Sequence, residues 1–423
     1  MDEYFNALEK YNFWESNPAN LGFPRKSYTQ KIQAYSNNRL IKVLVGQRRA
    51  GKSYLLRQLV LALIESGVSR KNIFFLNREI ADFDFIKNFK DLDALFKLYK
   101  EKIKPTGRIY LFIDEIQNID GWEKLVNSYS QDYTSEYELY ISGSNSKMLS
   151  GELATLLSGR YVSFEIFPLS YSEFLGISAQ KKGKESYLSF LQTGGLPELF
   201  QLNQEDVKRN YVSALKDTVL LRDIIQRHTI KDVQLLEDVF VFLVNNASNL
   251  ISIKNIVNYF KSNNRKTSYE TVAAYIGYIE DAYLVHKTER YNIKGKETVA
   301  GVAKYYINDL SFYNYLFRGF GYGFGYLLEN LMYLELRKAD YQVYVGTIKG
   351  MKVDFVATRG ERKIYVQSSY LLLDKDTIER EYASLELIKD NYEKIVVSID
   401  DINLPSKDGV KHVLAWNFAE YIQ

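Results

Sequence analysis

The residues of this chain best suited to chemistry lie between Gly46 and Ser53, where the sequence reads GQRRAGKS. A glycine, four variable positions, a second glycine, a lysine and a hydroxyl residue form a pattern that binds phosphate through backbone N–H groups. In this pattern Lys52 reaches the β- and γ-phosphates of a nucleotide, and the hydroxyl of Ser53 is a ligand of Mg²⁺. The alternative is a glycine turn with an incidental lysine. The expected nucleotide-binding residues are Gly46, Gln47, Arg48, Arg49, Ala50, Gly51, Lys52, Ser53 and, from a later strand, Ser144.

The segments on either side of this loop predict the geometry that it needs. Residues 40–45 (LIKVLV) are an apolar run typical of a buried parallel strand. After the loop, leucine and valine recur at helical spacing from Leu55 to Leu63. A strand, a glycine loop and a helix N-terminus together surround an anion with N–H groups and a favourable dipole. The sequence therefore predicts a loop that binds the phosphates of ATP, with Mg²⁺ beside it.

Two acidic residues, Asp114 and Glu115, follow a further apolar strand at residues 108–113. In phosphoryl-transfer enzymes an acid at such a position holds Mg²⁺, and a second acid polarises the attacking water. Mg²⁺ takes oxygen ligands in octahedral geometry, and a carboxylate at a strand end provides one. Acidic pairs also occur at sheet ends without any such role. We expect Ser53 and Asp114 to be metal ligands, and Glu115 and Lys52 to be catalytic.

Ser144 and Asn145 follow another predicted strand, at residues 138–143. Ligands of parallel sheets collect at the carboxyl ends of the strands, which places these side chains beside the phosphate loop. There they are candidates to touch the γ-phosphate or to position water for Glu115. The alternative is that one of them caps a helix.

Arg160 is the remaining catalytic candidate. An arginine finger stabilises the charge on the transferred phosphoryl group, and its contribution to the rate is ~10³–10⁵. The alternative is an ordinary surface arginine beside a glycine. Arg48 and Arg49 can contact phosphate, a neighbouring subunit or DNA, and the sequence gives them no single role.

The composition narrows the remaining possibilities. The chain has 423 residues, 46% hydrophobic and 25% charged, which is the balance of a soluble globular protein with two or three domains. A net charge of +3 gives no argument for nucleic acid by itself. With no cysteine and three histidines, disulfides and thiolate metal sites are excluded and a histidine-rich metal site is not expected. The N-terminus lacks a secretory pattern and no apolar run approaches the ~20 residues of a membrane span, so we expect a cytoplasmic protein without membrane contact.

Several segments together resemble one family. In chain order they are VGQRRAGKS (45–53), FIDEIQ (112–117), ISGSN (141–145), LSGRY (157–161), FPLSYSEFL (167–175), GGLPE (194–198), KYYINDL (304–310) and LENLMYLEL (328–336). In these segments the chain is similar to bacterial and archaeal AAA-type ATPases with an AAA_14-like P-loop domain and a C-terminal DUF4143 region. The resemblance implies ATP binding and hydrolysis by a RecA-like core, and it supplies no cellular role.

Residues 251–291 predict two helices with a polar turn between them and then a hairpin, the order of a winged helix-turn-helix. The family resembled here also carries one. In a DNA-binding version the start of the second helix enters the major groove, here with Lys266, Ser268 and Tyr269, and Arg265 lies near a phosphate. The second helix carries few basic groups, so docking of a protein is the alternative.

The last part of the chain looks like a PD-(D/E)xK nuclease that has lost its chemistry. Glu329 on a helix and Asp354 on a strand fit two of the acids that would hold Mg²⁺. Gln367 stands where a further acid belongs, and Ser369 where the lysine belongs. Lys363 lies on the same strand as an alternative source of charge. We expect an interaction module derived from a nuclease, without nuclease activity.

Together these features predict an α/β protein with a RecA-like P-loop NTPase core, a helical and winged-helix middle region and a C-terminal α/β nuclease-like domain. The expected parts are an N-terminal helical segment (1–35), the ATPase core (36–170), a helical lid or connector (171–235), the winged helix (236–300) and the degenerate nuclease-like domain (301–423).

The expected function is Mg²⁺-dependent ATP hydrolysis coupled to conformational change in the appended modules. The alternatives are a nucleotide-gated switch with little turnover and an ATP-regulated DNA nuclease. The candidate partners besides ATP are DNA, an unidentified protein and further copies of the chain in a homo-oligomer.

Overall fold

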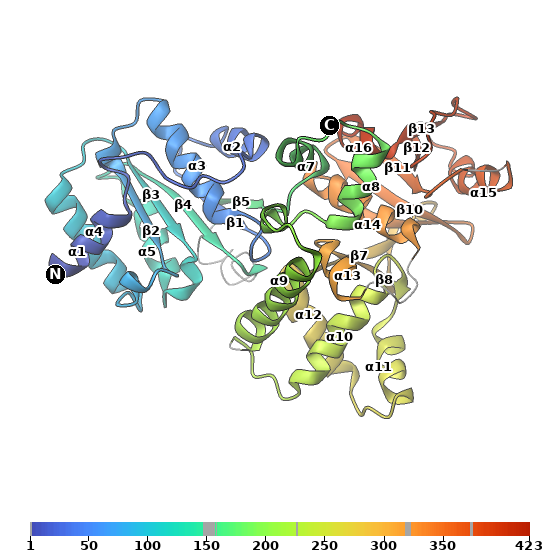
Figure 1. Ribbon diagram of the computed structural model, residues 1–423, viewed down its shortest axis with the longest axis horizontal. Coiled ribbons are helices and arrows are strands. Elements are labelled where there is room, and N and C mark those ends of the chain that lie inside the picture. The colour runs from blue at the N-terminus through green and yellow to red at the C-terminus, as the bar shows by residue number, and fades with distance from the viewer. Residues whose placement is uncertain (1, 147–156, 158, 226, 318–322, 373–374) are drawn as a thin grey trace. The chain divides into compact units, whose positions relative to one another are not determined.

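The computed structural model describes residues 2–146, 157, 159–225, 227–317, 323–372 and 375–423. The chain forms two compact units, Met1–Ile166 and Phe167–Gln423 (Figure 1). The division falls close to residue 170, the predicted end of the ATPase core. Among the described residues there is no helix with the length and apolarity that crossing a bilayer requires.

The first unit is a parallel sheet covered by helices, which confirms the predicted α/β class. Its strands lie in the order β2-β3-β4-β1-β5. The strands are β1 (Ile41–Val45), β2 (Ile73–Asn77), β3 (Ile109–Asp114), β4 (Tyr137–Gly143) and β5 (Tyr161–Glu165). The helices are α1 (Asp2–Tyr11), α2 (Lys26–Gln33), α3 (Lys52–Glu65), α4 (Phe89–Ile103) and α5 (Trp122–Gln131).

Helices cover both faces of this sheet because its strands are apolar on both sides, as parallel strands are. Leu44 on β1 packs in one core with Leu55 of α3. On the other face Phe74 of β2 stacks edge-on against Phe96 of α4, with 5.3 Å between the ring centroids. Since successive side chains of a strand point to opposite faces, each strand contributes to both cores.

The register of the strands brings their carboxyl ends to one edge. Val45 of β1 pairs with Gly143 of β4, and Asn77 of β2 pairs with Asp114 of β3. Strand β4 lies between β1 and β3. Residues at the end of β4 therefore lie between the loop that follows β1 and the acids that end β3.

The second unit is built on an eight-stranded mixed sheet in the order β13-β12-β11-β10-β9-β7-β8-β6. The strands are β6 (Leu250–Ile251), β7 (Val285–Asn292), β8 (Glu297–Ile307), β9 (Gln342–Ile348), β10 (Met351–Arg359), β11 (Arg362–Ser368), β12 (Glu393–Ser398) and β13 (Val410–Leu414). The α-helices are α7 (Tyr171–Ser178), α8 (Lys184–Thr193), α9 (Glu205–Asp217), α10 (Val233–Asn245), α11 (Ile253–Ser262), α12 (Tyr269–Asp281), α13 (Ser311–Leu316), α14 (Phe324–Lys338), α15 (Lys375–Glu386) and α16 (Ala415–Tyr421).

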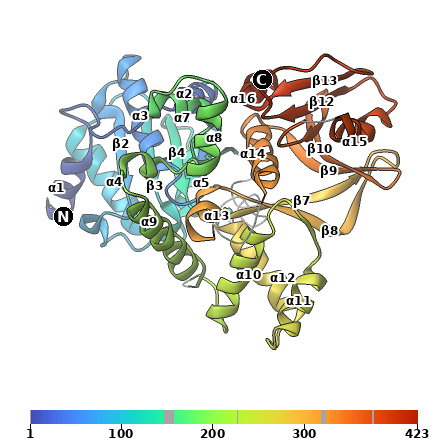
Figure 2. The ribbon, with the colours of Figure 1, turned by 45° about the vertical axis from the view of Figure 1, so that its right-hand side comes forward.

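The predicted boundary between residues 300 and 301 is wrong, because it falls inside β8. The hairpin strand β7 pairs antiparallel with β8 along its length and parallel with β9 at residues 290–292. The predicted wing is thus continuous with the sheet of the predicted nuclease-like domain. Figure 2 shows these long strands running from the helices α10–α12 toward β9 and β10.

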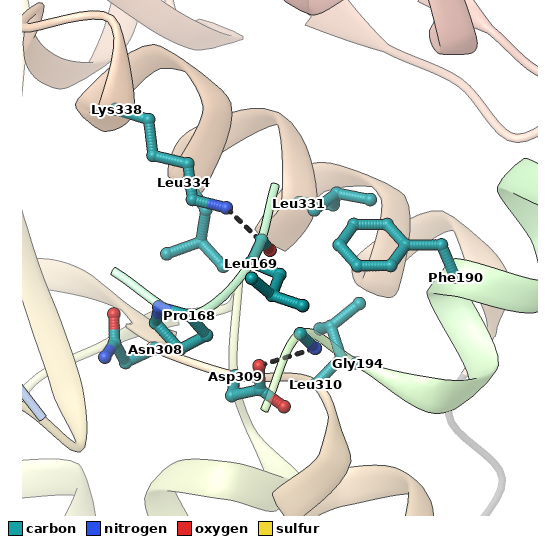
Figure 3. Close-up of a pocket in the computed structure, with 11 residues that line it drawn as sticks. Pro168, Leu169, Phe190, Gly194, Asn308, Asp309, Leu310, Leu331, Leu334 and Lys338 are labelled. Carbon is teal, nitrogen blue, oxygen red and sulfur yellow. Dashed lines mark hydrogen bonds between the residues drawn. The ribbon is translucent and has the colours of Figure 1, made fainter. Parts of the chain in front are cut away.

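Four of the segments that carry the family resemblance meet around Asp309 (Figure 3). The carboxylate of Asp309 accepts hydrogen bonds from the backbone N–H groups of Gly195, at 2.7 Å, and Ser311, at 2.9 Å. A Cβ atom on Gly194 would lie 2.4 Å from this carboxylate, and the residue has a φ of +82°. The cavity here is about 10 Å³, room for one water molecule. The motifs therefore build a packing junction and leave no space for a larger ligand.

Candidate functional site

The phosphate loop runs from the end of β1 to the start of α3 and needs its glycines. Gly46 has a φ of +142°, and a Cβ atom there would lie 2.3 Å from the carbonyl oxygen of Ile166. Gly51 has a φ of +98° and precedes the first residue of α3. The loop thus leads directly into a helix N-terminus, whose N–H groups and dipole favour an anion.

Lys52 is folded back across this loop. Its buried ammonium donates hydrogen bonds to the carbonyl oxygens of Gly46, at 2.9 Å, and Gln47, at 3.0 Å. Backbone carbonyls are neutral acceptors, and a phosphate oxygen that enters the loop would compete with them for the same N–H groups. The ammonium of Lys52 is therefore held against the phosphate loop.

Asp114 lies at the carboxyl end of β3 and is completely buried. Its carboxylate accepts hydrogen bonds from the hydroxyl of Ser142 and, at 3.1 Å, from the side-chain amide of Asn77. Burial, with a contribution from the charge of Glu115, raises the pKa of Asp114 to about 6, although Ser142, Ser53 and Lys52 act against this rise. A buried carboxylate beside a hydroxyl is a donor set that suits Mg²⁺.

Glu115 has a left-handed backbone with a φ of 53°, which L-residues adopt at a cost of about 1–2 kcal/mol. Its N–H group donates to the Ser142 hydroxyl at 3.2 Å, so one serine holds the backbone of Glu115 and the side chain of Asp114. The Glu115 carboxylate accepts hydrogen bonds from Gln117 and, at 3.4 Å, from Ser144. The strained turn aims this carboxylate at the end of β4.

The structure brings Ser144 to the acids, as the sequence predicts, through its bond to Glu115. Asn145 is the next residue and is also buried. Both follow β4, the strand between the phosphate loop and the acids. Lys52 and Ser53 begin α3 directly after the phosphate loop, and Ser144 joins the end of β4 to Glu115.

Arg160 lies elsewhere in this unit. It immediately precedes β5, and its carbonyl oxygen accepts a hydrogen bond from the N–H group of Ile41 at the start of β1. Five strand residues separate this amino edge from the phosphate loop, a distance of roughly 16 Å at ~3.3 Å per residue. The exposed Arg160 side chain is therefore not assembled with its own chain's phosphate loop.

Arg48 and Arg49 keep separate positions in the loop. Arg48 forms an ion pair with Glu79, which follows β2. Arg49 has a φ of 67°. The structure therefore provides Arg48 with a contact inside the unit and supplies no further role for either arginine.

Arg25, Asn77 and Gln117 contribute to the site and were not predicted, and Ser142 belongs to the segment 142–145 that was expected there but has a different part. Asn77 and Ser142 hold Asp114, and Gln117 holds Glu115. Arg25 is buried and donates from its guanidinium to the carbonyl of Ala50 at 3.0 Å. Asn77 and Ser142 end strands of the sheet, which was a usable signal, whereas Arg25 follows no motif.

In the second unit the structure brings Glu329 and Asp354 together with two lysines that the nuclease pattern does not include, Lys304 and Lys352. Gln367 and Ser369 lie on or beside the neighbouring strand β11. Lys363 is directed elsewhere and packs over the ring of Tyr365, 4.9 Å from its centroid.

Two of the four residues expected to contact DNA, Arg265 and Ser268, have structural partners. Arg265 forms ion pairs with Asp232, at 3.0 Å, and with Asp238. Ser268 caps α12 by accepting from the N–H group of Thr271 at 3.2 Å. Tyr269 is half exposed at the start of the helix.

The loop, its lysine and the buried acids define the first unit as a P-loop ATPase domain. A family model described as an AAA domain (AAA_14) matches residues 38–175, and a domain of unknown function, DUF8612, matches residues 184–321. The middle of the chain thus matches a domain with a different designation from the DUF4143 region that the sequence resembles.

Two relatives match most of the chain. An uncharacterized protein of Haemophilus influenzae is 34% identical over 399 residues, 93% of this chain and 98% of the relative. Another, from Methanocaldococcus jannaschii, is 33% identical over 388 residues, 86% and 81% of the two chains. The chain belongs to the family of these two proteins.

Solved structures show more distant similarity. A Walker-type ATPase of Pyrococcus abyssi has a TM-score of 0.43 at 15% identity and covers 70% of this chain and 95% of its own. The Orc1 protein of Aeropyrum pernix, solved with DNA, has a TM-score of 0.33 at 12% identity, with 71% and 94% covered. Scores of this size do not define the arrangement of the whole chain.

Proposed function

We propose that the first unit binds ATP with Mg²⁺ and hydrolyses it. The observation that supports this most directly is the buried ammonium of Lys52, which lies at the N-terminus of α3 and donates to the carbonyl oxygens of Gly46 and Gln47 at 2.9 and 3.0 Å. The two predicted ligands of Mg²⁺, Ser53 and Asp114, come from different elements of the unit, α3 and β3.

Each residue of the site has a part in this reaction. Lys52 exchanges its carbonyl acceptors for oxygens of the β- and γ-phosphates. Ser53 and Asp114 would hold Mg²⁺, which supplies positive charge to the phosphates when it is bound. Glu115 orients the attacking water, and Ser144 and Gln117 hold the Glu115 carboxylate by hydrogen bonds.

The test is a titration of the nucleotide-free protein with Mg·ATP, followed by a phosphate-release assay. We expect binding that is lost in Lys52→Ala and slow but measurable release of phosphate. A folded protein that gives no binding heat with Mg·ATP would refute the proposal.

We further propose that Arg160 acts on the nucleotide of a neighbouring copy. Its exposed position at the amino edge of its own sheet leaves it available to another subunit. Arg160→Ala should then lower turnover by ~10³ at unchanged ATP affinity. Mixing Arg160→Ala with Lys52→Ala should restore part of the activity, because each variant supplies what the other lacks. Full turnover by Arg160→Ala alone would make this residue a surface arginine.

The position of Arg160 also supports the second candidate function, a nucleotide-gated switch with little turnover as a monomer. The two candidates differ in one measurement. Sizing the protein with ATP, with ADP and without nucleotide should show assembly in ATP if the switch operates. Phosphate release that rises more steeply than protein concentration would show that the protein both assembles and hydrolyses ATP. Release proportional to protein concentration would favour an ATPase that is active as a monomer.

We infer that α10–α12 with β6–β8, the predicted winged helix, docks a protein rather than DNA. Antiparallel pairing of β6 and β7 with β8 supports the winged-helix topology. Arg265 is already neutralised by two aspartates, and the hairpin is paired with β9 near its end, so neither is available to a DNA groove. Duplex DNA binding whose log affinity falls against log salt by about 0.9 per neutralised phosphate would contradict this inference, above all if Lys266→Ala reduced the slope.

A further inference from the structure

Three buried ionisable side chains and one exposed one meet in the second unit, and we call them the internal ion cluster. They are Lys304 of β8, Glu329 of α14, and Lys352 and Asp354 of β10. The exposed fractions of these side chains are 0% for Lys304, 6% for Glu329, 3% for Asp354 and 42% for Lys352. Two carboxylates and two ammonium groups give the cluster no net charge. Its components lie on three elements that a metal centre of the nuclease type would also use.

The ammonium of Lys304 lies between the two carboxylates. It donates a hydrogen bond to Glu329 and lies 3.6 Å from the nearer carboxylate oxygen of Asp354. A buried ammonium is stable only when charges and acceptors replace its hydration, which the two carboxylates do. Burial lowers the pKa of Lys304, while Glu329 and Asp354 act in the opposite direction and favour its charged form.

Both carboxylate oxygens of Asp354 face partners within the chain. The Oδ1 atom forms ion pairs with Lys352 at 3.0 Å and Lys304 at 3.6 Å. The Oδ2 atom accepts from the N–H group of Ser368 at 3.0 Å and from the Ser368 hydroxyl at 2.9 Å. A metal ion at Oδ1 would therefore meet two ammonium groups, and the lone pairs of Oδ2 are already used by two donors.

Glu329 is held in the same way. Its Oε1 atom accepts from Lys304 and, at 2.7 Å, from the hydroxyl of Tyr306. Its Oε2 atom lies 3.7 Å from the ammonium of Lys352. Both oxygens therefore face cationic or hydroxyl donors that are part of the chain.

The two residues that differ from the nuclease pattern also have hydrogen-bond partners within the chain. Gln367 accepts from the N–H group of Asp354 at 3.1 Å and donates to Glu381 at 3.0 Å. The hydroxyl of Ser369 donates to the carbonyl of Leu371 at 3.2 Å. Over the part of the chain that the structure describes, no group of three or more His, Cys, Asp or Glu side chains is arranged to hold a metal ion.

We propose that Lys304 permanently takes the place of the divalent cation between Glu329 and Asp354. The residues do not fit Mg²⁺, because an ion there would need two carboxylate oxygens that are already bound and would meet two ammonium groups. The ammonium instead ties β8, α14 and β10 together, and the second unit is closed to metal-dependent phosphodiester cleavage. This proposal does not depend on ATP hydrolysis by the first unit.

The test is a titration of the whole nucleotide-free chain with Mn²⁺. The electron paramagnetic resonance signal of the free ion measures how much Mn²⁺ is bound. The wild-type protein should bind no Mn²⁺ through Asp354, so Asp354→Asn should give the same titration. Lys304→Met keeps the length of the side chain and removes its charge, and we expect it to create one site that binds Mn²⁺ at least tenfold more tightly. This site should disappear in the double variant with Asp354→Asn.

Lys352→Met is the matched control, since it removes the other lysine of the cluster and leaves Lys304 in place. It should create no site. Circular dichroism and ATP binding check that each variant is folded. If Lys304→Met unfolds in buffer alone, the proposal requires that Mn²⁺ restore its fold while KCl of equal ionic strength does not.

Three outcomes would overturn the proposal. The first is a wild-type Mn²⁺ site that Asp354→Asn removes. The second is a folded Lys304→Met protein that binds Mn²⁺ no better than the wild type. The third is an unfolded Lys304→Met protein that Mn²⁺ does not rescue.

Discussion

The phosphate-loop site of the first unit and the internal ion cluster of the second both bury two acids near lysine, with opposite results. In the first, Lys52 donates to backbone carbonyls, and Asp114 receives hydroxyl and amide hydrogen bonds. In the second, Lys304 and Lys352 contact Asp354 directly. The acids of the first unit are therefore held by neutral donors, whereas those of the second already have a cation.

The pKa directions of the two aspartates, Asp114 and Asp354, express the same difference. Burial raises the pKa of Asp114 to about 6, and Glu115 adds to the rise. Burial also acts to raise the pKa of Asp354, but Lys304 and Lys352 outweigh it and hold that pKa below its usual value. The carboxylate of Asp114 is costly to ionise, so a cation that arrives with a ligand would stabilise its charged form. The carboxylate of Asp354 is already paired with lysine and gains nothing from a further cation. The comparison thus separates a binding site from a structural one.

The largest effect should come from Glu115→Gln. The change keeps the side chain's size and removes the charge that orients water, so turnover of ATP should fall ~10²–10⁴-fold. Binding of Mg·ATP should persist, because Lys52 and Ser53 are intact. The measurement is phosphate release together with nucleotide affinity from calorimetry.

Asp354→Asn is the matched control for this experiment, as it alters an equally buried acid in the second unit. It should leave turnover per folded molecule unchanged. A parallel loss of turnover in both variants would mean that the two clusters do not have separate roles.

Asp354→Asn should instead destabilise the second unit. Removing one partner of a buried ion pair leaves uncompensated charge, at a cost of about 3–5 kcal/mol. Urea denaturation, with the two units followed as separate transitions, measures the change. Asp401→Asn provides the comparison, since Asp401 pairs with Lys184 at the surface, where such pairs contribute about 0–1 kcal/mol. Equal effects of the two substitutions would contradict the assignment of Asp354 to a structural cluster.

Asp114→Asn should have the opposite effect on stability, because it should stabilise the first unit rather than destabilise it. Since the folded pKa of Asp114 lies near 6 and its usual value is 3.8, the folded state binds the proton more tightly than the unfolded state. Stability of the nucleotide-free first unit should therefore fall as pH rises from about 4 to 6, by up to about 3 kcal/mol. The asparagine variant should lack this fall and be more stable than the wild type at pH 8. A wild-type unit whose stability rises over this range would contradict the predicted sign.

The candidate residues of the first site could be named from the sequence because they lie in local patterns at strand ends. Glycine spacing and apolar strands were sufficient to select Lys52, Ser53, Asp114 and Glu115, whose roles stay predictions. Arg160 was different, because its distance from the phosphate loop depends on how β5 pairs with β1. That register is a long-range property that one arginine beside a glycine does not reveal.

The internal ion cluster was only half predicted for a similar reason. Glu329 and Asp354 were identified by resemblance, but Lys304 joins them through the pairing of distant strands. A signal existed, because a lysine within the apolar run of β8 has to find a buried partner. Lys42 in β1 gives the same signal and pairs with Glu138 of β4 at 2.9 Å. Such lysines mark buried ion pairs, but the sequence does not say which acid they meet.

Arg25 gave no signal at all, and it provides the smallest and most specific prediction. Its guanidinium packs over Tyr28, 4.6 Å from the ring centroid, and donates to the carbonyl of Ala50 within the phosphate loop. Arg25→Lys keeps the charge but loses the planar fork of donors. The loss of one such hydrogen bond, about 1 kcal/mol, should raise KM for ATP roughly fivefold and leave kcat nearly unchanged.

Arg70→Lys is the control, because Arg70 also donates to a backbone carbonyl in the same unit, that of Ser16 at 2.7 Å, but away from the loop. This variant should lose stability without a change in KM. If Arg25→Lys lowered kcat instead, Arg25 would act on the reacting groups rather than on the shape of the loop. The distinction bears on the main comparison, because it tests whether the first site, like the ion cluster, depends on a buried cation that its motif does not include.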